Sequence, residues 1–100
     1  MAATSTWKNV ERRVAEKLNG VRVGNRGTNV EDIEHDVFSV EVKHRKAMPK
    51  IVEDSMAQCR RNNKSDKVPL LVLHSANSRY YYAVIDVDDL MALLAAGAKP

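Results

Sequence analysis

A stretch near the middle of the sequence constrains the fold more than any other feature. Apolar and polar side chains alternate there, with Phe38, Val40 and Val42 on one face and Ser39, Glu41 and Lys43 on the other. Successive side chains of a β-strand point to opposite faces of the sheet. The alternation over residues 31–44 therefore predicts extended chain with one buried face. Glu41 and Lys43 are expected to project together from the exposed face.

Local signals divide the rest of the chain into helices and strands. Helices are expected after an N-cap at Thr6, from Pro49 to about Asn63, and from Asp86 or Asp88 to Gly97. The first helix is expected to end at Asn19-Gly20, with Gly20 at positive φ. Further strands are expected at residues 21–23, 68–74 and 79–85. The resulting order, α-β-β-β-α-β-β-α, predicts an α/β fold with one mixed β-sheet flanked by helices.

Composition restricts the class of protein. The chain has 100 residues, of which 44% are hydrophobic and 29% are charged. This length suits a single domain covering residues 1–100. The lone cysteine, Cys59, excludes an intrachain disulfide and a cysteine-based zinc site. No apolar run approaches the roughly 18 residues of a membrane helix. These features favour a soluble, cytoplasmic protein without a membrane partner.

Positive charge is concentrated in the middle of the chain. The net charge is +3, and residues 41–67 hold eight Lys or Arg against four Asp or Glu. Residues 1–40 are balanced at six against six, and residues 68–100 hold two against three. A basic segment of this kind points to a polyanionic partner, although it is also typical of an ordinary solvated face.

Carboxylates converge on the alternating stretch if it forms a hairpin. A two-residue loop at Asp36-Val37 pairs Ile33 with Val40 and Asp32 with Glu41. Directly opposed residues share a face, so the two carboxylates would lie side by side. Oxygen ligands at this density suit a hard divalent cation such as Mg²⁺. Asp36 competes with Asp32 for the role of first carboxylate, but at the tip of the hairpin it would lie far from Glu41.

Glu11 lies on the first expected helix, about 55° from the centre of its apolar stripe. That stripe consists of Trp7, Val10, Val14 and Leu18. A glutamate at such a border is either a solvated surface residue or a carboxylate held at the margin of the core, facing the sheet. The sequence leaves both readings open.

Together these elements resemble the PD-(D/E)XK nuclease superfamily. The residues that carry the likeness are Glu11, Asp32-Ile33, Ser39-Val40-Glu41-Val42-Lys43 and Gln58 on the second expected helix. Residues 32–46 look most like the small Holliday junction resolvases of archaea and phages. The resemblance implies a restriction-endonuclease-like core, α-β-β-β-α-β, with a terminal strand and helix added. The residue before the motif aspartate is usually proline in that family, and here it is Glu31.

The resemblance also implies an activity and its residues. It implies a DNA endonuclease that uses Mg²⁺ or Mn²⁺ to hydrolyse phosphodiester bonds in branched DNA such as four-way junctions. Asp32 and Glu41 would bind the metal, Glu11 would support it, and Lys43 would activate or orient water. Because a resolvase cuts two opposed strands, a homodimer is expected. The basic residues expected to contact DNA phosphates are Arg26, Arg45, Lys46 and Lys50.

Other interpretations remain open at this point. The chain can be another nuclease of the same superfamily, such as a nicking or repair enzyme. It can also be a catalytically silent nucleic-acid-binding module. Gln58 matches a recurrent glutamine of the resolvases, or it is an ordinary surface residue. Three consecutive tyrosines, Tyr80 to Tyr82, can stack bases, although tyrosine in strands more often packs in the core.

Overall fold

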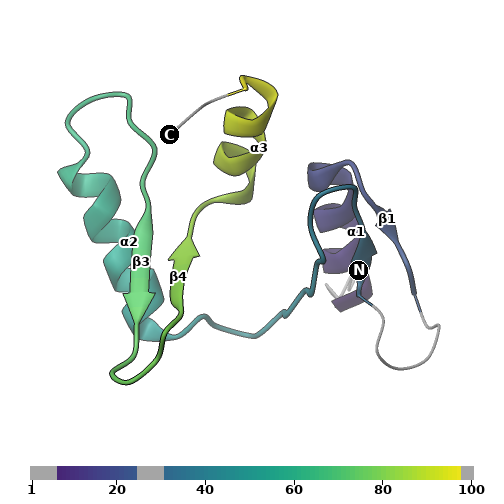
Figure 1. The fold of residues 1–100 in the computed structure, drawn as a ribbon, viewed down its shortest axis with the longest axis horizontal. Coiled ribbons are helices and arrows are strands. Elements are labelled where there is room, and N and C mark those ends of the chain that lie inside the picture. The colour runs from purple at the N-terminus through teal and green to yellow at the C-terminus, as the bar shows by residue number, and fades with distance from the viewer. Residues whose placement is uncertain (1–6, 25–30, 98–100) are drawn as a thin grey trace, which may run out of the picture. The chain divides into compact units, whose positions relative to one another are not determined.

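The computed structural model describes residues 7–24 and 31–97 (Figure 1). The chain divides into two compact units, the first ending at Lys46 and the second beginning at Ala47. The first unit holds α1 (Trp7–Leu18), β1 (Val21–Arg22) and β2 (Ile33–Glu34). The second holds α2 (Lys50–Asn62), β3 (Leu71–His74), β4 (Tyr81–Val84) and α3 (Val87–Ala95). The small α/β class is confirmed, while the expected cap at Thr6 lies outside the described residues.

The predicted order of elements holds except at the third strand. Residues 41–46 adopt neither helix nor strand, and Val40 contributes only an isolated antiparallel bridge to Ile33. Within the described ranges, β1 and β2 form one two-stranded antiparallel sheet, and β3 and β4 form another. The prediction of a single mixed sheet is therefore wrong for these residues. A local cause is visible at Val42, whose N–H is taken by the side chain of Asp32 instead of by a neighbouring strand.

Helix α1 packs against β1 through a face different from the predicted one. Its buried residues are Glu11, Ala15 and Leu18, while Trp7 is half exposed. At 100° per residue, the buried face is rotated by roughly 60° from the predicted apolar stripe. Glu11 consequently lies near the middle of the buried face instead of at its border.

The connection after α1 depends on a close backbone approach. Asn19, not Gly20, adopts the positive φ, at 58°. Asparagine tolerates the left-handed conformation better than most residues. Gly20 is needed for a different reason: a Cβ atom there would lie 2.6 Å from the Glu34 carbonyl oxygen and 2.7 Å from Ile33 Cγ2. The predicted helix end is confirmed, but the predicted positive φ at Gly20 is wrong.

In the second unit, α2 lies beside β3 (Figure 1). Met56 on α2 is buried, and the thiol of Cys59 donates to the Leu70 carbonyl at 3.4 Å. Along β3, half-buried and exposed side chains alternate, and Val72 is 55% exposed. The nearly continuous apolar run of residues 68–74 predicts a strand that is covered on both faces. That prediction is wrong here, because a two-stranded sheet with a helix on one side leaves its other face open.

The last helix begins and ends as its sequence predicts. The Asp86 carboxylate accepts hydrogen bonds from the N–H groups of Asp88 at 2.9 Å and Asp89 at 3.2 Å. This is N-capping, which satisfies donors that the first helical turn leaves free. Beyond Ala95, Gly97 takes a φ of 63°. None of the helices in the described ranges combines the length and apolarity that crossing a bilayer demands.

Candidate metal and nucleic-acid site in the first unit

The hairpin of the first unit has the predicted register at its centre. Ile33 and Val40 form an antiparallel bridge, and Ile33 is fully buried. The bend falls at Asp36-Val37, as the two-residue loop requires. A buried residue at this bridge fixes which neighbouring side chains reach the surface, because a shift by one residue would turn Ile33 outward.

His35 holds the tip of this hairpin. Its Nδ1 accepts hydrogen bonds from the N–H groups of Val37 at 3.0 Å and Phe38 at 3.3 Å. Its ring also stacks on Phe38 with centroids 5.0 Å apart. Asp36 is exposed at this tip. The sequence did not single out His35 for this role, although a histidine directly before a tight turn is a suitable acceptor for its N–H groups.

Asp32 is fixed by both its backbone and its side chain. Its N–H donates to the Val40 carbonyl at 2.9 Å, and its own carbonyl accepts from Val23 N–H at 2.9 Å. Its Oδ2 accepts from Val42 N–H at 2.6 Å. The backbone bond to Val40 departs by one residue from the predicted Asp32–Glu41 pair. The carboxylate is nevertheless bound to the backbone between Glu41 and Lys43.

Glu41 and Lys43 lie on the same side of the chain, as the alternation predicts. Lys43 Nζ is 3.4 Å from Glu41 Oε2, and both side chains are well exposed. An exposed pair of this kind contributes little to stability. Both groups therefore remain accessible to solvent and to a ligand.

Glu11 has a partner that the sequence did not reveal. Arg22 Nε on β1 donates to Glu11 Oε1 at 2.8 Å, and the two side chains are 21% and 11% exposed respectively. Glu11 is therefore a buried carboxylate and not a solvated surface residue, and its partner is a guanidinium. The only signal in the sequence was the need of a buried carboxylate for a cation.

Two carboxylates of the predicted metal site have oxygen atoms open to solvent. Asp32 Oδ1 makes no hydrogen bond within the described residues, and the Glu41 carboxylate is exposed. Oxygen donors of this kind suit Mg²⁺ or Mn²⁺. In the same ranges, no group of three His, Cys, Asp or Glu side chains is gathered closely enough to hold a metal ion. The third predicted carboxylate, Glu11, is paired with Arg22.

An open depression of about 430 Å³ lies elsewhere in the first unit. Its lining includes the acidic residues Glu31, Glu34 and Asp36, together with His35. Three carboxylates around an open depression repel a polyanion. This surface is thus a poor candidate for DNA binding.

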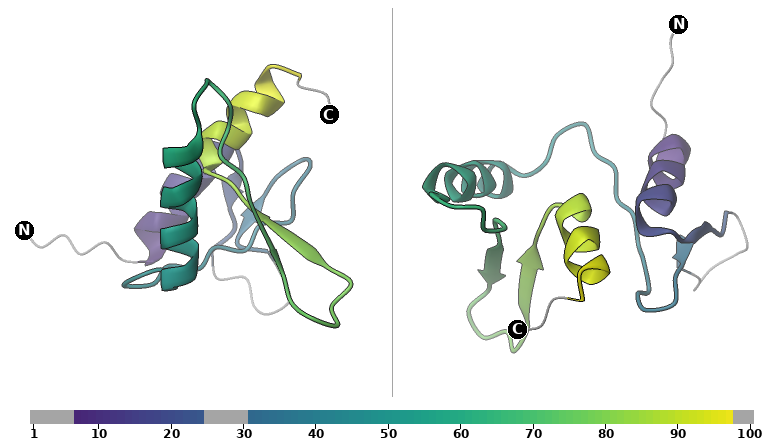
Figure 2. Two further views of the ribbon diagram at one scale, coloured as in Figure 1. Left: turned by 90° about the vertical axis from the view of Figure 1, so that its left-hand side faces the viewer. Right: turned by 90° about the horizontal axis from the view of Figure 1, so that it is seen from above.

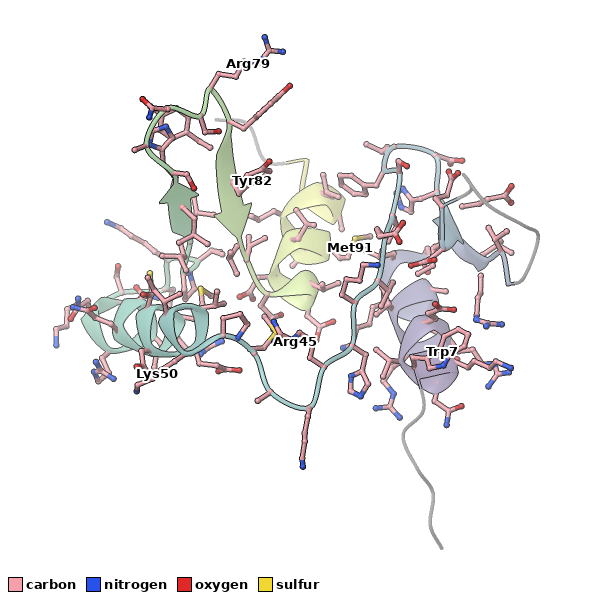
Figure 3. All side chains as sticks on the ribbon, turned by 90° about the horizontal axis from the view of Figure 1, so that it is seen from below. Trp7, Arg45, Lys50, Arg79, Tyr82 and Met91 are labelled. Carbon is pink, nitrogen blue, oxygen red and sulfur yellow. The ribbon has the colours of Figure 1, made fainter. Side chains whose placement is uncertain are left out.

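The expected DNA-contacting residues are solvent-exposed where they are described. Arg45 and Lys46 are exposed at the end of the first unit, and Lys50 is exposed at the start of α2 (Figure 3). Lys50 Nζ pairs with Asp54 Oδ2 at 2.7 Å, one helical turn away. Arg26 lies outside the described residues. Gln58, also exposed, belongs to α2 in the second unit.

Comparisons of this chain with protein-family models, with curated proteins and with solved structures found no match.

Proposed function

We propose that this protein is a metal-dependent DNA endonuclease that uses Mg²⁺ or Mn²⁺. The hydrogen bond from Val42 N–H to Asp32 Oδ2 is the observation that carries the proposal. It holds one carboxylate against the backbone that separates Glu41 from Lys43. Two acids can bind the metal ion of a phosphodiester hydrolase, and a lysine beside them can stabilise the negative charge that develops in the reaction.

Each residue has a role that follows from its position. Asp32 Oδ1 and the Glu41 carboxylate are the metal ligands. The bound ion supplies Lewis-acid stabilisation and lowers the pKa of water. The Lys43 ammonium donates hydrogen bonds to the attacking water or to the phosphoryl oxygen that gains negative charge. The exposure of Lys43 permits both contacts.

We propose that the ion pair between Glu11 and Arg22 opens when the metal and DNA bind. Glu11 joins the metal ligands only when its ion pair with Arg22 opens. The released guanidinium then offers planar donors to a phosphate oxygen. Exchange of partners keeps each charge paired, which matters because burying an unpaired charge is costly.

The proposed substrate is branched DNA, and the proposed assembly is a homodimer in the cytoplasm. Support comes from the resemblance to Holliday junction resolvases and from the exposed cations Arg45, Lys46 and Lys50. These cations are suited to phosphate contacts that position DNA without reading its sequence. Arg26 is proposed for the same role on sequence grounds alone.

The test compares a synthetic four-way junction with linear duplex of the same composition, in Mg²⁺, Mn²⁺, Ca²⁺ and EDTA. We expect junction cleavage in Mg²⁺ or Mn²⁺ and binding without turnover in Ca²⁺, which accepts looser geometry. Equal cleavage of linear duplex would instead identify another nuclease of the superfamily. Undiminished cleavage in EDTA would eliminate the metal site.

A silent nucleic-acid-binding module is the second candidate. One observation favours it. Arg22 forms an ion pair with the Glu11 carboxylate, so the proposed metal site has two carboxylate ligands instead of three. This candidate predicts junction binding that is unchanged by divalent ions, and no cleavage in any of them. The same experiment therefore separates the two functions.

A further inference from the structure

The β3–β4 hairpin carries three consecutive tyrosines that the structure leaves uncovered. Tyr80, Tyr81 and Tyr82 are 54%, 69% and 64% exposed. Tyrosine in a strand usually packs against neighbours. Exposed aromatic side chains clustered on one element indicate a contact surface for a partner.

The register of the hairpin divides these tyrosines between two faces. Tyr82 pairs with Leu73, and Tyr81 pairs with His74. Because residues two apart share a face, Tyr80 lies on the face of Tyr82. The Tyr81 ring is already stacked on His74, with centroids 4.2 Å apart and planes 14° apart. One side of the Tyr81 ring is therefore occupied.

The Tyr80 and Tyr82 rings lie nearly parallel to each other. Their centroids are 6.4 Å apart, and their planes are inclined by 25°. This is about the distance between side chains two residues apart on a strand. The two rings therefore form a pair of exposed aromatic faces on which a planar base can stack.

Charge on this hairpin favours a polyanion such as a nucleic acid over a basic or neutral protein surface. The chain carries no acidic residue between Asp66 and Asp86, and Arg79 lies in that interval. The Arg79 guanidinium covers the Tyr80 ring at 5.0 Å and donates to the Tyr80 hydroxyl at 3.1 Å. An arginine beside stacking rings supplies a phosphate partner next to a base platform.

The turn that presents this face is held by its own hydrogen bonds. Ser78 N–H donates to the Ser75 carbonyl at 3.1 Å, and Tyr80 N–H donates to Ser78 Oγ at 3.1 Å. Between them, Asn77 takes a φ of 67°. Both views of Figure 2 show the turn extending past α2 and α3. Figure 3 shows Arg79 at this end of the hairpin and Tyr82 on β4.

From these observations we propose that the face formed by Arg79, Tyr80 and Tyr82 binds single-stranded nucleic acid. A base stacks on Tyr80 and Tyr82, and Arg79 contacts the adjoining phosphate. Stacking tolerates any base, since every base has a π-face, so the binding is independent of sequence. This surface goes beyond the cleavage site, and its binding requires no metal.

The test measures fluorescence anisotropy of a labelled oligothymidine strand with the full chain in EDTA, which prevents cleavage. We expect Tyr80→Leu and Tyr82→Leu each to weaken binding about tenfold, because each removes one stacking ring. Tyr80→Phe and Tyr82→Phe keep the ring and should keep the parent affinity. Circular dichroism of each variant reports whether the fold is retained.

Tyr81→Leu is the matched control, since it removes the same side chain from the opposite face of the same strand. Its affinity should stay at the parent value. Parent affinity in Tyr80→Leu and Tyr82→Leu, or an equal loss in Tyr81→Leu, would overturn the proposal. So would a parent dimer that Tyr82→Leu dissociates in sedimentation velocity without loss of oligothymidine binding, because the face would then be a contact between two copies.

Discussion

The two units of this protein differ in how far they bury their apolar and charged side chains. In the first, Ile33 is fully buried, and the charged pair Glu11–Arg22 is drawn into the interior with it. In the second, Met56 is the buried side chain among the described residues, while Val72 and the tyrosines of β4 face solvent. The first unit thus buries more of its side chains than the second, although Trp7, Val21 and Val37 of the first unit are exposed as well.

The two units also differ in the hydrogen bonds that hold them together. The first unit is held by polar bonds of fixed direction, such as Val42 N–H to Asp32 Oδ2. Bonds of this kind are suited to placing reactive groups at fixed positions. The second unit relies on local hydrogen bonds in its helices and hairpin, and its uncovered side chains are free to meet a partner. We therefore expect chemistry in the first unit and recognition in the second.

The largest expected effect comes from replacing each of the two competing aspartates of the first unit, in turn, by asparagine. Asp32→Asn keeps an acceptor for Val42 N–H but removes the charge that a hard cation needs, so cleavage should vanish. Asp36→Asn changes an exposed turn position where asparagine is equally suitable, so activity should survive. Junction cleavage in Mg²⁺ is the measurement. The reverse outcome would transfer the metal ligand to Asp36.

A second test removes the lysine of the first unit. Lys43→Ala should lower the cleavage rate about 100- to 1000-fold, as expected for loss of one electrostatic donor at the reacting phosphate. Junction binding should persist. Lys64→Ala, an exposed lysine of the second unit, is the control and should cleave at the parent rate. A folded Lys43→Ala that matches the control would remove Lys43 from the mechanism.

Stability should respond unequally to loss of apolar groups in the two units. Ile33→Ala deletes a fully buried side chain and should lower the free energy of unfolding by about 2–5 kcal/mol. Val72→Ala affects a side chain that is 55% exposed, and a change within about 0.5 kcal/mol is expected. Urea denaturation measures both. A large loss for Val72→Ala would mean that its face is covered in solution, and the comparison would fail.

The smallest expected effect contrasts one ion pair from each unit, Glu11–Arg22 and Lys50–Asp54. Glu11→Gln retains an acceptor for Arg22 but removes its partner charge, and should cost about 1–3 kcal/mol of stability. Asp54→Asn breaks the exposed pair with Lys50 and should cost no more than about 0.5 kcal/mol. Thermal unfolding of the two variants checks this. Equal costs would show that Glu11 is as solvated as Asp54.

Features that depend on near neighbours could be read from the sequence. The hairpin register at Ile33 and Val40, the cap at Asp86 and the end of α1 all follow from turn and capping residues within a few positions. Alternation also predicted that Glu41 and Lys43 share a side. These structures are local, so the side chains that determine them are adjacent in the chain.

Features that depend on distant residues were decided only by the tertiary structure. The sequence gives no sign that Arg22 pairs with Glu11 eleven residues earlier, or that the Asp32 side chain accepts the N–H of Val42 from the segment after the hairpin turn. The exposure of β3 likewise depends on which elements cover it, and its apolar composition alone predicted the opposite. Burial and pairing of charges are properties of packed neighbours, and packing brings together residues that sequence position keeps apart.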